Sequence, residues 1–246
     1  MNALETKTPF VAIACGGTGG HLFPGIAVAE ELKKRGCKIA LLISPKEIDR
    51  QAVKTVKDFE IFTLPAVGLQ NRNYFSFALN FWNSFRASRK IFKQRKPDAV
   101  LAMGGFTSAP PILSARKFGA KTFLHESNTI PGRANRFLAK FADEAFVGFP
   151  ETAQKLRAKK VSVTGTPVRL QFCSSGRESA QNSGNQSRLT SAATIENYRT
   201  ALGLDPNLPA ILVVGGSQGA SGLNEMVLSA LSLLAGKNWQ WLHLTG

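Results

Sequence analysis

The chain has 246 residues, 43% of them hydrophobic, which is enough for one large domain or two smaller ones. Lys and Arg (31) outnumber Asp and Glu (16), and the net charge of +15 predicts anionic partners such as phosphate groups, lipid headgroups or nucleic acid. The three cysteines lack metal-ligand spacing, so we expect no metal or other cofactor. The N-terminus has no basic region followed by a long apolar stretch, so we expect no signal peptide, and no run approaches the ~20 apolar residues that a membrane span needs.

Short apolar runs alternate with amphipathic ones along the first two thirds of the chain. Nearly continuous apolar runs are typical of parallel strands that are buried on both faces. The predicted strands are Phe10–Ala14, Lys38–Ile43, Glu60–Leu64, Asp98–Met103, Lys121–His125, Glu144–Phe149 and Val161–Gly165. Helical patterns such as Leu22–Arg35 lie between most of them, so we expect a doubly wound α/β domain.

The segment Leu69–Lys96 predicts a helix of unusual composition. No Asp or Glu occurs between Ile61 and Pro97, whereas seven Lys or Arg do. One face carries aromatic residues expected in the core, namely Tyr74, Phe77, Phe81, Phe85 and Phe92. A second stripe begins apolar and continues basic, namely Phe75, Leu79, Trp82, Arg86, Arg89, Lys90 and Lys93.

Apolar groups followed by cations favour binding to an anionic membrane surface. A wide core face with a solvated basic edge would give the same pattern. Nucleic-acid binding is a third interpretation, but no recognised RNA- or DNA-binding motif accompanies the helix, so we expect no nucleic acid among the partners.

The composition changes after the seventh predicted strand. Residues 1–170 are predicted to form the first domain, and 171–200 a polar linker or insertion, in which Cys173–Thr194 has almost nothing to bury. Residues 201–246 carry one strand–helix–strand unit, "PAILVVGG", "GASGLNEMVLSALSLLAG" and "WQWLHL". Two parallel strands would leave one face and both edges open, so we expect most of a second domain to be missing from this chain.

Glycine-rich turns follow three of the predicted strands. "ACGGTGGHLFPG" and "VVGGSQGASG" both run from a strand through glycines and a hydroxyl residue into a helix, and "AMGGFTSAPP" is a third such turn. Glycine lets a phosphate or sugar approach the backbone, and a helix N-terminus attracts anions, although tight turns alone would also use glycine. Neither main loop matches the dinucleotide fingerprint or the P-loop.

Five motifs in order carry a resemblance to a known family. "GGTGGHLFPGIAVAEEL", "MGGFTSAPP", "LHESNTIPGRANRFLAK", "GTPVR" and "VVGGSQGASGLNEMV" closely resemble the bacterial undecaprenyl-diphospho-muramoylpentapeptide β-N-acetylglucosaminyltransferases, the MurG family. The resemblance implies a GT-B fold of two Rossmann-like domains. It also implies transfer of N-acetylglucosamine from UDP-GlcNAc to lipid I, giving lipid II for peptidoglycan, with cell-wall or division proteins as further partners and anionic lipids of the inner leaflet as the surface.

The resemblance implies site residues as well. The donor would be bound by Gly17, Thr18, Gly19, Asn128, Arg169 and Ser217. The acceptor diphosphate would be bound by Gly20, His21, Gly104 and Gly105. Two positions depart from the family pattern, because Ser127 stands where Gln is usual and Thr166 where Asn is usual.

Inverting sugar transfer requires a base for the acceptor hydroxyl and stabilisation of the departing diphosphate. Histidine titrates near neutrality, which makes His21 the first candidate base. His21 could instead cap the loop or hydrogen-bond the acceptor diphosphate. Glu126 is the second candidate, and a structural carboxylate at the strand end is the alternative for it.

The sequence leaves three functions open. The first is a membrane-associated glycosyltransferase on the cytoplasmic side of the inner membrane. The second is a non-catalytic remnant that binds a lipid or a nucleotide, and the third is a GT-B transferase acting on another lipid. Turnover of UDP-GlcNAc with a lipid I analogue separates the first from the other two.

Overall fold

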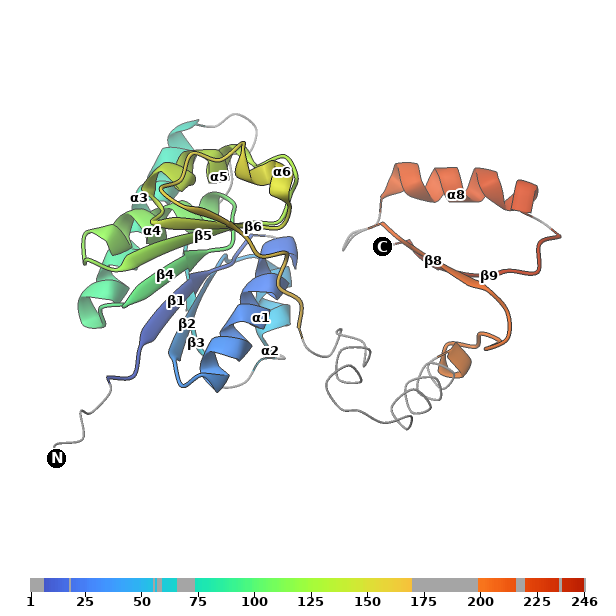
Figure 1. Cartoon of the computed structure of the whole chain (residues 1–246), viewed down its shortest axis with the longest axis horizontal. Coiled ribbons are helices and arrows are strands. Elements are labelled where there is room, and N and C mark those ends of the chain that lie inside the picture. Colours follow the sequence, from blue (N-terminus) through green and yellow to red (C-terminus); the bar gives the residue numbers. More distant parts are fainter. Residues whose placement is uncertain are drawn as a thin grey trace. The chain divides into compact units, whose positions relative to one another are not determined.

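The computed structural model describes residues 7–17, 19–54, 56, 59–65, 74–169, 199–215, 220–234 and 236–245. The chain divides into two compact units, Met1–Phe172 and Cys173–Gly246, and each is described by itself. Their helices and strands are labelled in Figure 1. The linker predicted at 171–200 lies outside the described residues except for residues 199 and 200.

The described part of the first unit is built on a seven-stranded parallel sheet of order β3-β2-β1-β4-β5-β6-β7. Its strands are β1 (Phe10–Ala14), β2 (Lys38–Ile43), β3 (Glu60–Thr63), β4 (Ala99–Ala102), β5 (Lys121–Glu126), β6 (Glu144–Val147) and β7 (Val161–Val163). The central strand β1 pairs Ile13 with Leu41 of β2 and with Leu101 of β4. Because β1 and β4 begin the two halves of the sheet, the strand order reverses between their carboxyl ends, where doubly wound sheets bind ligands.

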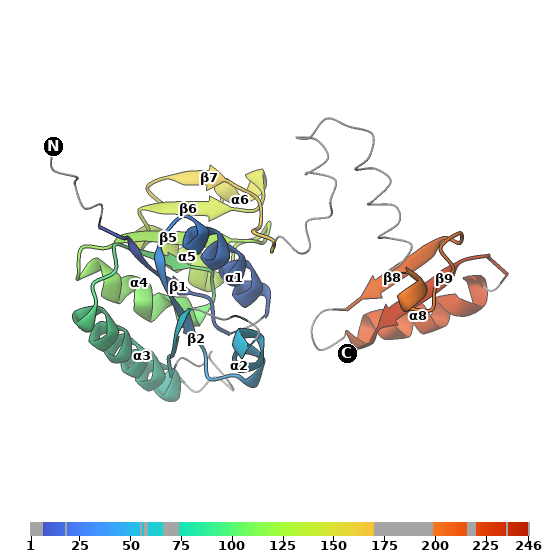
Figure 2. The same ribbon diagram turned by 90° about the horizontal axis from the view of Figure 1, so that it is seen from below.

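Helices cover both faces of this sheet (Figures 1 and 2). They are α1 (Gly19–Lys34), α2 (Glu47–Lys54), α3 (Tyr74–Gln94), α4 (Ala109–Arg116), α5 (Arg133–Leu138) and α6 (Pro150–Ala153), with 3₁₀ turns η1 (Phe106–Ser108) and η2 (Ala139–Phe141). One core packs α1 and α2 on the sheet through Leu22, Ile26 and Val53. The other core packs α3, α4 and α5 on the opposite face through Phe92, Ile112 and Leu138.

The predicted strands of the first unit are all present, and the fold class is confirmed. Four of them end one or two residues earlier than predicted, because the strand pairing stops before the end of the predicted run, and β5 ends one residue later, at Glu126. Helix α1 begins three residues before the predicted Leu22, so Pro24 lies beyond its first turn, where it has no N–H to donate to the carbonyl of Gly20.

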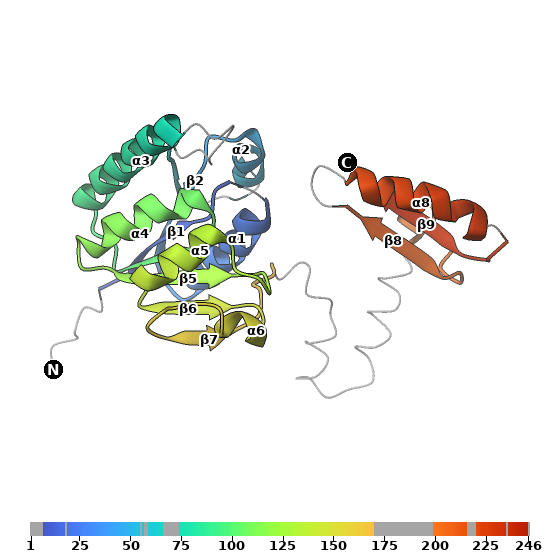
Figure 3. The same cartoon turned by 90° about the horizontal axis from the view of Figure 1, so that it is seen from above.

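Figure 3 shows α3 beside α4, and the aromatic face predicted for α3 is only partly core. Phe85 and Phe92 are buried, and Phe77 and Phe81 are half-buried. The prediction was wrong for Tyr74, which is 66% exposed. Helical periodicity places Tyr74 on the same face as Phe92, but it does not reveal that the first turn of α3 reaches past the helices that bury the rest.

The described part of the second unit is small. It holds the parallel pair β8 (Ala210–Val214) and β9 (Gln240–Leu244), joined by α8 (Ser221–Leu234). Val227 is its one fully buried hydrophobic side chain among the described residues, while Leu212, Leu228 and Leu233 are exposed. These elements confirm the strand–helix–strand unit predicted from the sequence.

Candidate active site

The carboxyl ends of β1 and β4 bring two glycine loops together. Met103 N donates to Ala14 O at 2.8 Å, so the strands stay paired up to the start of their loops. Beyond them, Thr107 Oγ1 donates to Gly16 O at 2.6 Å, and Ser108 Oγ lies 3.0 Å from Ala14 O. Both hydroxyl groups are buried, and they fix the second loop against the first.

The ring of His21, in the first turn of α1, packs against the backbone of Gly104 and Gly105. A Cβ atom on Gly104 would stand 2.9 Å from His21 Nε2, and one on Gly105 would stand 3.3 Å from His21 Cε1. Both glycines also have positive φ angles, +115° and +77°, which other residues rarely adopt. Only glycine therefore lets the second loop approach the imidazole so closely. Gly19 and Gly20 form the start of the same helix α1.

Burial lowers the pKa of His21 below its usual value of 6.5. The carboxylates of Glu126 and Asp49 oppose this shift, and His125 adds to it. The imidazole is therefore neutral at pH 7, with one nitrogen free of a proton, which is the form that a general base requires.

Gly17 is held through both of its backbone groups. Its N–H donates to Asp49 Oδ2 at 2.8 Å, and its carbonyl accepts from Lys46 Nζ at 2.7 Å. The same carboxylate oxygen accepts from Ser44 N at 3.1 Å, and Asp49 is completely buried. The first glycine loop is therefore fixed to the β2–α2 connection before any ligand binds.

Glu126, the last residue of β5, is buried and accepts four hydrogen bonds. Oε1 accepts from Asn128 N at 2.9 Å and from Asn128 Nδ2 at 2.8 Å. Oε2 accepts from Gly132 N at 3.0 Å and from Asn135 Nδ2 at 2.9 Å. These bonds organise the loop from β5 to α5, and they leave the carboxylate little capacity to take a proton from a substrate.

His125, one residue earlier on β5, forms hydrogen bonds with the loop after β5 and with the loop after β7. A carbonyl can only accept, so His125 Nε2 donates to Gly165 O at 3.0 Å, and Nδ1 accepts from Ser127 Oγ at 3.3 Å. Burial lowers the pKa of His125, against the opposing effects of Gly165 O and Glu126, so the ring is neutral. His125 therefore stabilises the positions of these loops through hydrogen bonds and does not act as a charged group.

The residues expected to bind the donor are spread over two places. Asn128 is exposed beyond β5, with its amide on Glu126. Arg169, the last described residue of its segment, donates from Nη2 to Glu30 Oε1 at 2.8 Å and from Nε to the same oxygen at 3.2 Å. Thr18 and Ser217 lie outside the described residues.

A second surface lies along α3. Phe75, Leu79 and Trp82 are 82%, 51% and 54% exposed. The basic residues predicted on the same stripe, Arg86, Arg89, Lys90 and Lys93, are exposed as well and line a pocket of about 460 Å³ with Phe118. We call these seven stripe residues the α3 stripe. Of the helices that the structure describes, none is both long and apolar enough to cross a membrane.

Comparison with known proteins gives the family. The model of the glycosyltransferase family 28 N-terminal domain matches residues 11–147, and that of the family's C-terminal domain matches residues 210–246. The chain belongs to glycosyltransferase family 28.

The relatives of this family 28 chain share one name. UDP-N-acetylglucosamine–N-acetylmuramyl-(pentapeptide) pyrophosphoryl-undecaprenol N-acetylglucosamine transferase of Prochlorococcus marinus is 36% identical over 97% of this chain and 60% of its own length. The protein of the same name from Treponema denticola is 36% identical over 96% of this chain and 59% of its own. The chain thus spans about 60% of the length of these relatives.

Solved structures agree with the GT-B assignment. MurG of Acinetobacter baumannii is 26% identical with a TM-score of 0.61, covering 97% of this chain and 68% of that one. UDP-GlcNAc 2-epimerase of Neisseria meningitidis bound to UDP-GlcNAc has a TM-score of 0.62 at 15% identity, over 95% and 65% of the two chains. The second likeness concerns the fold alone.

Three residues of this family 28 site were not predicted from the sequence. Asn135 lies inside a quoted motif, and its Nδ2 stands 3.0 Å from the place of a Gly104 Cβ. Glu30 also lies inside a quoted motif, whereas Asp49 lies in none, and the sequence did not reveal their partners, because each acts on a residue at least 32 positions away. Within the described part of the chain, no group of three or more His, Cys, Asp or Glu is placed to hold a metal ion.

Proposed function

We propose that this protein transfers N-acetylglucosamine from UDP-GlcNAc to the MurNAc sugar of lipid I, undecaprenyl-diphospho-MurNAc-pentapeptide, and thereby makes lipid II. One observation carries the proposal. A neutral histidine on a glycine loop packs against a second glycine loop, at the point of the sheet where the strand order reverses. The name that these two relatives share supports the same reaction, and each is 36% identical to this chain over the aligned residues.

His21 acts as the general base in this proposal. Its neutral ring accepts the proton of the acceptor hydroxyl as that oxygen attacks the anomeric carbon and UDP leaves with the bonding electrons. Base catalysis of this kind contributes about 10²–10⁴ in rate. The four hydrogen bonds on Glu126 support a positioning role for that residue, so we assign the proton transfer to His21 alone.

The two diphosphates use backbone groups. Gly20, Gly104 and Gly105 would receive the acceptor diphosphate beside His21, and Gly17, Thr18 and Gly19 would face the donor. The N-terminus of α1 supports this assignment, because it favours negative charge without a metal ion. Asn128, Arg169 and Ser217 complete the proposed donor contacts.

The α3 stripe would hold the protein on the cytoplasmic face of the membrane as a peripheral protein. Its exposed aromatic side chains would enter the headgroup region, and its cations would face anionic lipids. An acceptor with an undecaprenyl tail stays in the bilayer, so the enzyme has to work at this surface. Contacts with other cell-wall or division proteins belong to the same proposal.

The test is a transfer assay of the full-length protein with radiolabelled UDP-GlcNAc and a lipid I analogue. We expect a labelled lipid product, and expect none with an acceptor that lacks the MurNAc sugar. A protein that binds the acceptor but transfers no sugar would be a binding remnant. Transfer to another polyprenyl-linked sugar in preference to lipid I would assign it a different acceptor. Either result overturns the proposal.

A further inference from the structure

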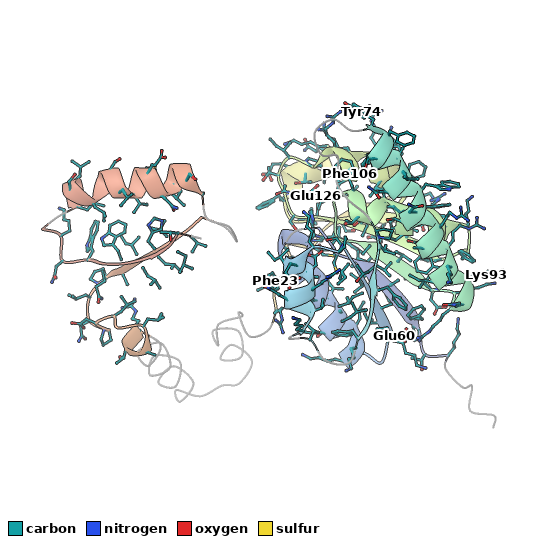
Figure 4. All side chains as sticks on the ribbon, turned by 180° about the vertical axis from the view of Figure 1, so that it is seen from behind. Phe23, Glu60, Tyr74, Lys93, Phe106 and Glu126 are labelled. Carbon is teal, nitrogen blue, oxygen red and sulfur yellow. The ribbon has the colours of Figure 1, made fainter. Side chains whose placement is uncertain are left out.

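An exposed aromatic cluster lies directly beside the glycine loops. Phe106 follows Gly105 in the chain and is 43% exposed. Its ring meets that of Phe77 edge to face, with centroids 5.3 Å apart and planes at 82°. Tyr74 lies one helical turn before Phe77, and Figure 4 shows Tyr74 at the end of α3 above Phe106, with Glu126 nearby. We call Tyr74, Phe77 and Phe106 the aromatic shelf.

The fold does not require an aromatic side chain at position 106. The neighbouring Thr107 and Ser108 carry the buried hydrogen bonds that fix the loop. Phe106 leaves much of its ring exposed, and the same is true of Tyr74. Exposed aromatic rings that adjoin one another are typical of a binding surface.

The position of the shelf indicates the chemistry of its ligand. At one side lies the loop with Gly104 and Gly105, which offers backbone groups beside His21. At the other side lies the first turn of α3, which carries the aromatic rings of Tyr74 and Phe77. A molecule that covers both needs an anionic group joined to a hydrocarbon chain. Inorganic pyrophosphate alone would leave the rings uncovered.

We infer that the aromatic shelf binds the first isoprene units of a polyprenyl diphosphate, while the diphosphate lies at the Gly104–Gly105 loop. This inference rests on the proposed function, because it assigns a site to the lipid part of the proposed acceptor. The shelf thereby recognises the substrate at the junction between its diphosphate and its lipid, independently of the sugar.

The shelf differs from the α3 stripe. At 100° per residue, Phe77 points roughly opposite to Phe75 and Trp82 around the helix axis. A variant of Phe106 should therefore affect the binding of a soluble prenyl diphosphate and spare vesicle binding. A variant of Trp82 should do the reverse.

The experiment measures calorimetric dissociation constants for farnesyl diphosphate, kept below its micellar concentration, and for inorganic pyrophosphate. We expect farnesyl diphosphate to bind at least about tenfold more tightly, because the prenyl chain adds apolar contact with the rings. Phe106→Ala should remove most of this difference, and Phe106→Leu should restore part of it. Phe137→Ala is the matched control. Phe137 is also an exposed aromatic residue, and its ring centroid lies 5.1 Å from that of Phe141.

Two results would overturn the inference. One is equal affinity of the unaltered protein for farnesyl diphosphate and pyrophosphate, which would give the shelf to another occupant. The other is an equal loss in Phe106→Ala and Phe137→Ala. The proposed function fails separately. Prenyl binding through Phe106 without sugar transfer refutes the function and leaves the shelf. Sugar transfer together with either of the two results above refutes the shelf alone.

Discussion

His21 owes its chemical state to the residues that surround it. The two glycines that it faces contribute backbone and no side chain, and their backbone desolvates the ring on that side. Burial then favours the neutral imidazole. In the proposed reaction, the nitrogen of His21 serves proton transfer, and the backbone of the adjacent glycines serves diphosphate binding.

Replacing His21 tests the first of these roles. We expect His21→Ala to lower the transfer rate by about 10²–10⁴ with little change in acceptor affinity. Because burial lowers the pKa of His21, the acid limb of the pH–rate profile should fall below pH 6.5 and vanish in the variant. A loss smaller than tenfold, with the acid limb retained, would exclude the general-base role.

Glu126→Gln separates a positioning carboxylate from a catalytic one. Each oxygen of Glu126 faces two N–H donors, so either orientation of the new amide sets its NH₂ against donors. An unsatisfied buried group costs about 1–3 kcal/mol, and we expect a loss of unfolding free energy of this order in urea titrations.

The control is Asn128→Ala, which removes one donor from an exposed position and should cost less. A Glu126→Gln protein with unchanged stability and abolished transfer would instead identify Glu126 as the base.

Local sequence patterns predict the helices and strands of the first unit closely, but they do not predict the contacts between loops that are distant in the sequence. Apolar runs predicted every strand, since strands buried on both faces need them. Glycines predicted the loops around His21. In contrast, the pairing of Arg169 with Glu30 spans 139 positions, and only the assembled fold brings these two residues together. The exposure of Tyr74 likewise depends on where the neighbouring helices end.

At the scale of α3, charge and aromatic residues make separable contributions to membrane binding. Reversing the charge of Arg86, Lys90 and Lys93 to Glu should weaken binding to anionic vesicles at least about tenfold in flotation assays. Added salt should weaken the binding of the unaltered protein, since exposed charges are screened. Trp82→Ala should also weaken vesicle binding, and the size of this loss should depend little on the salt concentration.

The matched control reverses three exposed lysines elsewhere in the unit, Lys34, Lys38 and Lys54, and changes the net charge equally. These residues belong to α1, β2 and α2, whereas α3 covers the opposite face of the sheet. Equal weakening by both sets, or equal binding to neutral and anionic vesicles, would contradict a role specific to the α3 stripe.

At the scale of the whole molecule, the two units differ in how much apolar surface their described residues bury. The first has a core on each face of its sheet, and its central strand β1 is fully covered. In the second unit, every residue of β8 and β9 is half-buried or exposed, and Val227 is the one buried residue in the described part of α8. Burial of apolar area is the main source of stability, so the units should unfold independently.

We expect residues 1–169 to fold without the rest of the chain. Both cores lie within this range, and so do the hydrogen bonds around His21 and Glu126. The isolated fragment should therefore melt within a few degrees of the main transition of the whole chain in calorimetry. In limited proteolysis, the polar composition of Cys173–Thr194 predicts the first cuts there, followed by a resistant N-terminal fragment. A fragment 1–169 that fails to fold, or one whose transition lies far below that of the whole chain, would mean that the second unit contributes to the stability of the first.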